Sequence, residues 1–146
     1  MNTARGTQLI ESYMQGRQRR FFRGHHDDEF FFLVSAYHGR LHVHMQASGS
    51  DVDITVTAEH YFPAARRAAV AALVQQWNDA DLPAVATVSA SCDPQRIGVV
   101  AERRYRAVDG DFGRFVDQTV QSAIDLFGRL RAVSAPSSAS DLRDAG

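Results

Sequence analysis

Hydrophobic and polar residues alternate with a period of two along three stretches between positions 29 and 59. A period of two is the spacing of a strand that buries one face and leaves the other in water. The spacing becomes helical over 63–78, returns to strand-like over 84–91 and 97–107, and is helical again over 111–131. The pattern therefore predicts the element order βββ-α-ββ-α.

The first of these stretches, 30–37, is apolar on both sides of the predicted strand. Phe30 and Phe32 lie on one side, whereas Phe31 and Leu33 lie on the other. Such a pattern is typical of a central strand that is covered on both faces. If helices cover only one face of the sheet, Phe31 and Leu33 instead form an exposed apolar strip, and strips of this kind usually mark interfaces.

The next two stretches alternate cleanly and are joined by short turns. His38-Gly39 predicts a tight hairpin turn after the first strand, because glycine tolerates positive φ. Ser48-Gly49-Ser50 predicts the second turn. The inward-facing positions are Leu41, Val43, Met45, Ala47, Val52, Ile54, Val56 and Ala58. We expect an antiparallel meander of three strands with one face in water.

Three helical segments complete the predicted fold. A short amphipathic helix is predicted over 7–15, a second helix starts at Pro63, and a long helix closes the domain. The predicted class is α+β, with an antiparallel sheet, helices on one face and the order α-βββ-α-ββ-α. We divide the chain into a helix and charged connector (1–28), one α+β domain (29–132) and a disordered tail (133–146), whose composition is poor in large apolar residues.

Composition and charge exclude several classes of function. The chain has 146 residues and a formal net charge of -1, which gives no electrostatic case for nucleic acid or anionic membranes. Arginines surround Phe21 and Phe22, and such a mixture can stack on bases, but acidic residues follow directly. The chain has no apolar span of membrane length, and Cys92 is its single cysteine. We therefore expect a cytoplasmic protein that binds neither nucleic acid nor membrane.

Few residues suggest catalysis. His42 and His44 share one strand face, and together with His60 they could supply ligands for zinc, which needs three or four. The alternative is that these histidines are ordinary polar residues on a wet strand face. Cys92 precedes Asp93, and an acidic neighbour disfavours a reactive thiolate. No phosphate-binding, dinucleotide-binding or nucleophile-elbow motif is present, so we expect no enzyme activity and no cofactor.

From Glu29 to Leu130 the sequence resembles the class I type III secretion chaperone fold, and it is most similar to the YbjN-like family. The short-turned hairpin matches, as does the acidic strand from Asp51 to Val56. In the family, the helix after the third strand typically ends in a hydrophobic-x-x-hydrophobic-Asn pattern, which Val74-Gln75-Gln76-Trp77-Asn78 fits. The N-terminal helix is shorter than usual. The resemblance implies a small, non-enzymatic homodimer that binds peptide segments of other proteins.

These observations lead to one main hypothesis and two alternatives. The main hypothesis is a chaperone-like or adaptor protein, with secretion as one setting, that holds a segment of a partner protein or secreted substrate. The alternatives are a regulatory protein of the same fold without a holdase role, and a metal-dependent enzyme that uses the three histidines. The candidate packing or interface residues are Phe31, Leu33, Trp77 and Phe112, with Arg103 and Arg104 as a polar rim.

Overall fold

The computed structural model describes residues 5–25, 28–36 and 39–134 of the chain. They form a seven-stranded antiparallel sheet with three α-helices, which confirms the predicted α+β class and the main element order. The elements in chain order are α1 (Arg5–Gly16), β1 (Phe22–Arg23), β2 (Glu29–Ala36), β3 (Gly39–Ser48), β4 (Asp51–Ala58), β5 (Phe62–Pro63), the 3-10 turn η1 (Ala64–Arg66), α2 (Arg67–Asp79), β6 (Val85–Ala90), β7 (Arg96–Tyr105), the 3-10 turn η2 (Ala107–Asp109) and α3 (Phe112–Ser134).

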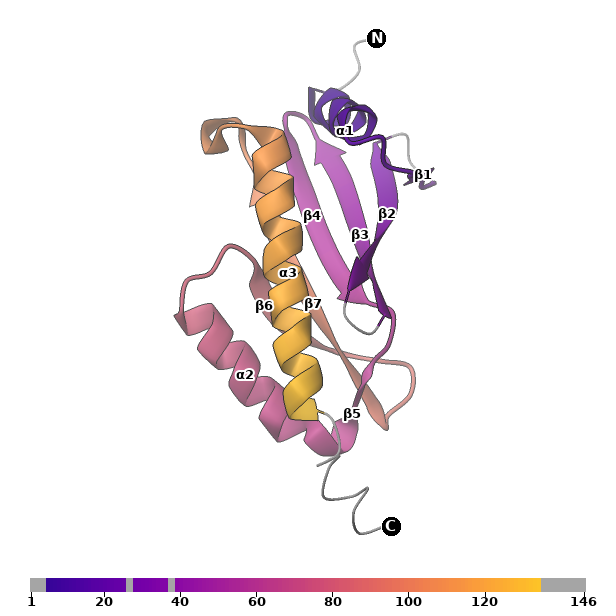
Figure 1. Ribbon diagram of the computed structural model, residues 1–146. Helices are drawn as coiled ribbons and strands as arrows, with labels where there is room; N and C mark the ends of the chain where they lie inside the picture. The colour runs from indigo at the N-terminus through magenta and orange to yellow at the C-terminus, as the bar shows by residue number, and fades with distance from the viewer. Residues whose placement is uncertain (1–4, 26–27, 37–38, 135–146) are drawn as a thin grey trace.

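Strands β2, β3 and β4 form the predicted meander, and β7 continues the sheet beside β4 (Figure 1). The order across the sheet is β1-β2-β3-β4-β7-β5, with β6 paired to β7 on its other side. The register places Phe31 opposite His44 and His44 opposite Thr55. The sheet therefore ends at β1 and β2 on one side and at β6 on the other.

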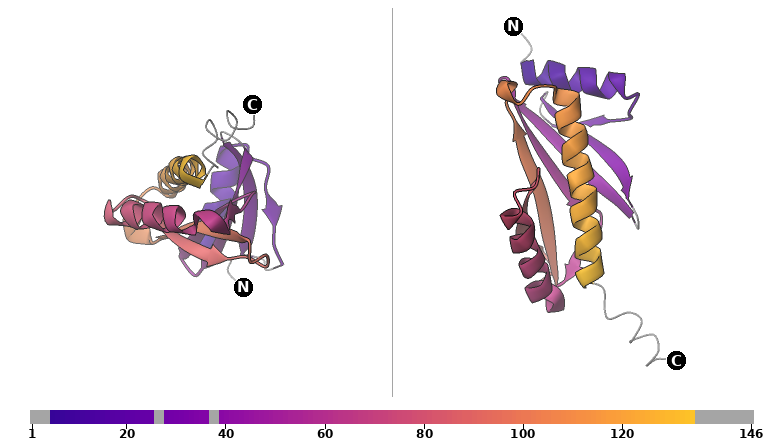
Figure 2. Two further views of the ribbon diagram at one scale, coloured as in Figure 1. Left: turned by 90° about the horizontal axis from the view of Figure 1, so that it is seen from below. Right: turned by 60° about the vertical axis from the view of Figure 1, so that its left-hand side comes forward.

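The two faces of the sheet differ in burial. The inner face carries Phe30, Phe32, Val43, Met45, Ile54 and Val56, all fully buried. The long helix α3 lies along this face, with α1 across one end and α2 beside β6 (Figure 2). We call the opposite side the outer face, and no helix of the described chain covers it. Its side chains on β2, β3, β4 and β7 are exposed or half-buried.

Helix α1 is fixed to α3 by a polar contact at the edge of the core. The Tyr13 hydroxyl donates a hydrogen bond to Asp117 Oδ1 at 2.8 Å. Arg17 pairs with the same carboxylate, which raises the pKa of its guanidinium. Burial and the Asp117 hydrogen bond raise the pKa of Tyr13 from 10.0 to about 12. The Tyr13 ring also lies 6.3 Å from that of Phe32, so α1 packs under β2.

Strand β2 is not the doubly covered central strand that its sequence predicts. It is the first long strand from the edge of the sheet, and Phe31 and Leu33 are each 37% exposed on the outer face. The alternative, an exposed apolar strip on a sheet with helices on one face, is confirmed. Apolar residues on both faces of a strand show that each face is suited to burial, and not that a second layer from the same chain covers both.

Two element boundaries also differ from the prediction. The second helix begins at Arg67 rather than Pro63, because Pro63 still pairs with Arg96 of β7 and residues 64–66 form a 3-10 turn. Helix α3 extends to Ser134, two residues into the predicted disordered tail. Position 38 of the predicted hairpin turn and the rest of that tail lie outside the described residues. None of the helices in the described part of the chain combines the length and apolar character needed to cross a bilayer.

Candidate functional site

The outermost long strand, β2, has backbone groups that pair with no other strand in the described part of the chain. The Gly24 N–H donates to the Glu29 carbonyl at 2.8 Å, whereas the Ala47 N–H donates to the Asp28 carbonyl at 2.9 Å. Backbone groups in antiparallel strands point to alternate sides, so Leu33 and Ser35 point away from β3, as Glu29 does. Strand β1 pairs only with Phe30 and Phe31. Among the described residues, 32–36 therefore have a strand partner on one side only, and we call this the open edge.

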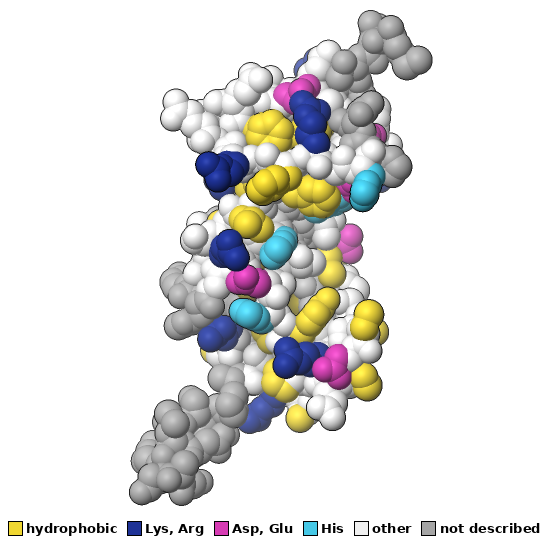
Figure 3. Space-filling model, turned by 90° about the vertical axis from the view of Figure 1, so that its right-hand side faces the viewer, with side chains coloured by type: hydrophobic (Ala, Val, Ile, Leu, Met, Phe, Trp, Pro, Cys, Tyr) yellow, Lys and Arg dark blue, Asp and Glu magenta, His cyan; other side chains and the backbone are white. Residues whose placement is uncertain are grey.

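Exposed apolar side chains lie beside the open edge on the outer face. Phe22 of β1 pairs directly opposite Phe31 of β2 and is 55% exposed. Leu33 follows two residues after Phe31 on the same side of the strand. Figure 3 shows hydrophobic side chains gathered on this side of the molecule, with basic, acidic and histidine side chains around them. We call Phe22, Phe31 and Leu33 the apolar patch.

At the other edge of the sheet, side chains from α2 bond the first residues of β6. Asn78 Nδ2 donates to the Ala86 carbonyl at 2.9 Å, and the Ala86 N–H donates to Asn78 Oδ1 at 2.9 Å. One amide side chain thus makes the two hydrogen bonds that a neighbouring strand would make to Ala86. Trp77 Nε1 also donates to the Ala84 carbonyl at 2.8 Å. These bonds give a physical role to the Trp77-Asn78 pair of the sequence pattern, which is to bond α2 to the start of β6.

The structure brings together only part of the predicted interface set. Phe31 and Leu33 lie in the apolar patch, but Trp77 and Phe112 are 3% and 6% exposed and pack in the core. The Phe112 ring makes edge-on contacts with Tyr13 and Tyr105. Within this chain, these two aromatic residues contribute to packing and present almost no surface to a partner.

The two arginines proposed as a polar rim point to opposite faces of the sheet. Arg103 lies on the inner face, 3.8 Å from the Phe115 ring centre, and donates to Thr119 at 3.3 Å. Burial lowers its pKa. Arg104 lies on the outer face and makes two hydrogen bonds to Asp53, which raise its pKa. Neither lies on β2 or β3, so they form no common rim with the apolar patch.

The histidines do not come together as a ligand set. His44 Nε2 lies 2.8 Å from Glu29 Oε2, whereas His42 pairs across from Thr57 and His60 lies beyond the end of β4. Over residues 5–25, 28–36 and 39–134, no three His, Cys, Asp or Glu side chains gather closely enough to hold a metal ion. The Phe31 and His44 rings contact each other with centres 5.0 Å apart, which links His44 to the apolar patch.

Sequence reasoning missed Phe22 as a member of the patch. The arginine-rich segment has two adjacent phenylalanines, either of which could pack onto the core. Phe21 does so, with its ring 5.8 Å from that of Phe30, but Phe22 points to the outer face. The signal was available, because adjacent residues of an extended segment must point to opposite sides.

No protein-family model matches the chain, and no curated protein matches its sequence. The fold is similar to that of the crystal structure of YbjN, a proposed transcription regulator from E. coli. The match has a TM-score of 0.69 at 14% sequence identity and covers 87% of this chain and 92% of the other. At this identity the likeness concerns the fold, so the resemblance expected from the sequence is confirmed at that level. The chain has a YbjN-like fold.

Proposed function

We propose that this chain is a non-enzymatic adaptor or chaperone-like protein that binds an extended segment of a partner protein along the open edge. The observation that carries the proposal is the position of the Leu33 and Ser35 backbone groups, which have no strand partner among the described residues, directly beside the apolar patch. An added strand would pair its main chain with these groups. Its alternate side chains would contact Phe31 and Leu33 on one face and the half-buried Val34 on the other.

The energetics favour a bound segment of moderate affinity. Each new main-chain hydrogen bond contributes about 0.5–1.5 kcal/mol net. Apolar area removed from water adds about 25 cal/mol per Å². Ordering an extended peptide opposes both contributions. Selectivity would come from the alternate side chains that face the patch, because main-chain pairing does not distinguish sequences.

The fold comparison supports a regulatory or adaptor role. YbjN is described as a proposed transcription regulator, and an open strand edge is one of the features through which regulators bind other proteins. Holdase activity is a finer proposal. A holdase would suppress aggregation of its partner in a light-scattering assay, whereas a regulator without that role would bind the partner and leave its aggregation unchanged. We place both roles in the cytoplasm and expect a homodimer.

Site-specific cross-linking tests the proposal. A photo-reactive phenylalanine analogue at Phe31 should give a reproducible protein adduct in cell extract, and peptide mapping should place the adduct in one extended segment of the partner. The matched control carries the analogue at Val108, which is 90% exposed on η2 and outside the patch. An equal yield of adducts at both positions, or none at Phe31, would refute the proposal. An adduct between two copies of this chain would show that the edge serves the dimer instead.

A further inference from the structure

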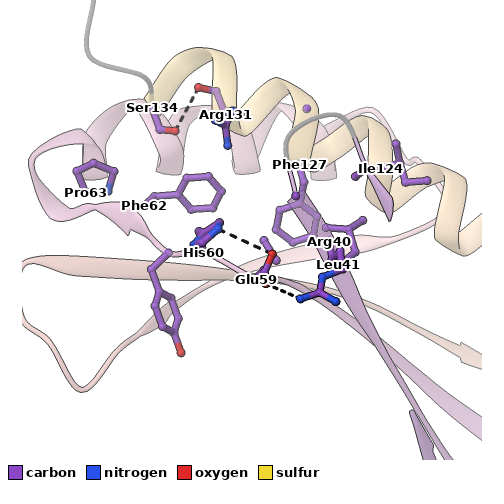
Figure 4. A pocket seen from close by; sticks show the side chains of 15 residues that line it. Arg40, Leu41, Glu59, His60, Phe62, Pro63, Ile124, Phe127, Arg131 and Ser134 are labelled. Carbon is purple, nitrogen blue, oxygen red and sulfur yellow. Dashed lines mark hydrogen bonds and ion pairs between the residues drawn. The ribbon is translucent and has the colours of Figure 1, made fainter. Parts of the chain in front are cut away.

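A second feature of the molecule lies between the sheet and the C-terminal part of α3. A pocket of about 280 Å³ opens there, between α3, β5 and the paired ends of β3 and β4 (Figure 4). Its walls are mainly apolar and include Ala36, Leu41, Ala58, Phe62, Ile124 and Phe127. The pocket is on the helix side of the sheet, so it is separate from the apolar patch on the outer face.

The aromatic walls of the pocket are rigid. The rings of Phe62 and Phe127 stack with centres 6.5 Å apart and planes 7° apart. Both side chains are largely buried, at 8% and 6% exposure, and Leu41 is buried at 3%. A pocket formed by such residues exists before a ligand enters, and it offers an apolar lining close to the lower size limit of small-molecule sites.

Among the described residues, the rim of the pocket has two arginines, Arg40 and Arg131, but only one carboxylate, that of Glu59. Arg40 Nη2 donates to Glu59 Oε1 at 3.1 Å, and this hydrogen bond lowers the pKa of Glu59. His60 Nε2 lies 3.8 Å from the other oxygen of the same carboxylate. Arg131 also lines the pocket, and within the described residues its side chain forms no ion pair. The uncompensated charge at the rim is therefore positive.

We propose that this pocket binds a small carboxylic acid with a short apolar chain, its carboxylate on Arg131 and its chain between Phe62, Phe127 and Ile124. The charge of Arg131 selects an anion, and the apolar walls select the chain. This proposal does not rest on the proposed binding of a partner at the open edge, because the pocket shares only Ala36 with that edge and no side chain with the apolar patch.

The test compares three ligands of equal length on the full-length protein. Octanoate, octanamide and octylamine share one apolar chain but carry a negative, neutral and positive end group. We expect octanoate to bind, with NMR shift changes confined to the pocket residues, and octanamide to bind roughly tenfold more weakly because it lacks the charge-assisted bond to Arg131. Butanoate should be weaker still, since each buried methylene changes affinity roughly fourfold.

Variants of two exposed arginines on α3 separate the role of Arg131 from general charge. Arg131→Gln should remove the preference for octanoate over octanamide and leave octanamide binding unchanged. Arg114→Gln, near the other end of α3 and outside this pocket, should leave both affinities as they are. The proposal is overturned if octanoate does not bind, if octanamide binds as tightly, or if Arg131→Gln and Arg114→Gln behave alike.

Discussion

The two edges of the sheet differ in whether their outward backbone groups have hydrogen-bond partners. At β6, the Asn78 side chain makes both main-chain hydrogen bonds to Ala86. At β2, the outward groups of Leu33 and Ser35 have no strand partner among the described residues, and exposed Phe31 lies beside them. Soluble proteins usually protect an edge with charge, proline or a covering element. The chain thus bonds side chains to the first residues of one edge and leaves apolar residues along the other, which is why we propose pairing at β2.

The largest expected effect distinguishes the two faces of β2 itself. Phe32→Ala should lower the free energy of unfolding by about 3–5 kcal/mol, because the ring is fully buried and its loss leaves a cavity. Phe31→Ala should cost about 1 kcal/mol or less, because the ring is on the outer face. Denaturant unfolding of both variants measures the difference. Equal losses would mean that the outer face is covered in solution.

Alkaline pH should weaken the core under the open edge. Burial and the Asp117 hydrogen bond hold the pKa of Tyr13 at about 12, above its ordinary value of 10. Because this pKa is higher in the folded state, the protonated Tyr13 hydroxyl contributes fully to the free energy of unfolding below pH 10. That contribution is lost as the pH rises toward 12. The loss amounts to at most about 2–3 kcal/mol.

The control for this titration is Tyr13→Phe. The variant keeps the ring against Phe32 but has no hydroxyl to ionise, so its unfolding free energy should lack the decline between pH 10 and 12. If the variant and the parent lose stability in parallel, other groups cause the alkaline decline.

The next prediction concerns the hydrogen bonds between the Asn78 side chain and Ala86 of β6. Asn78→Ala leaves the N–H and C=O of Ala86 without their side-chain partner, which should cost about 1–3 kcal/mol. Gln76→Ala, an exposed change two residues earlier in α2, should stay within about 0.5 kcal/mol. Thermal or urea unfolding compares the two. An Asn78→Ala variant as stable as Gln76→Ala would contradict the stabilising role of Asn78.

The smallest effect on stability should accompany a large effect on binding. Ser35→Pro removes an N–H that points away from β3, and edge positions of this kind tolerate proline. We expect stability to change by about 1 kcal/mol or less and capture of the partner to be lost. Ser35→Ala, which keeps the N–H, should still capture the partner. If Ser35→Pro captures as well as the parent, the partner does not pair with this edge.

The long strands could be predicted from the local alternation of apolar and polar residues. Alternation over β3 and β4 identified their buried residues, because a period of two permits only one assignment of faces. Strands β1 and β5 have two residues each and were missed, since they exist only through pairing with β2 and β7. Arg103 and Arg104 were grouped because they are neighbours in sequence, although neighbours in a strand point to opposite faces.

The candidate site was predictable only in part. Phe31 and Leu33 stood out because they are apolar on a second strand face. Whether that face is covered depends on where α1, α2 and α3 pack, which local sequence does not encode. The pocket beside Phe62 and Phe127 was not predicted, because residues far apart in the chain form it only after folding. Asn78 was noticed through resemblance, and its role became clear only once Ala86 lay beside it.

Amide hydrogen exchange at the two edges tests the central claim most directly. In the protein without its partner, the Leu33 and Ser35 amides should exchange fast, whereas the Ala86 amide, bonded to Asn78, should exchange slowly. A peptide of the cross-linked partner segment should slow Leu33 and Ser35 at least about tenfold, since each amide then gains a main-chain acceptor, and leave Ala86 unchanged. Leu33 and Ser35 amides that already exchange slowly without the peptide, or whose exchange the peptide leaves unchanged, would contradict pairing of a partner at the open edge.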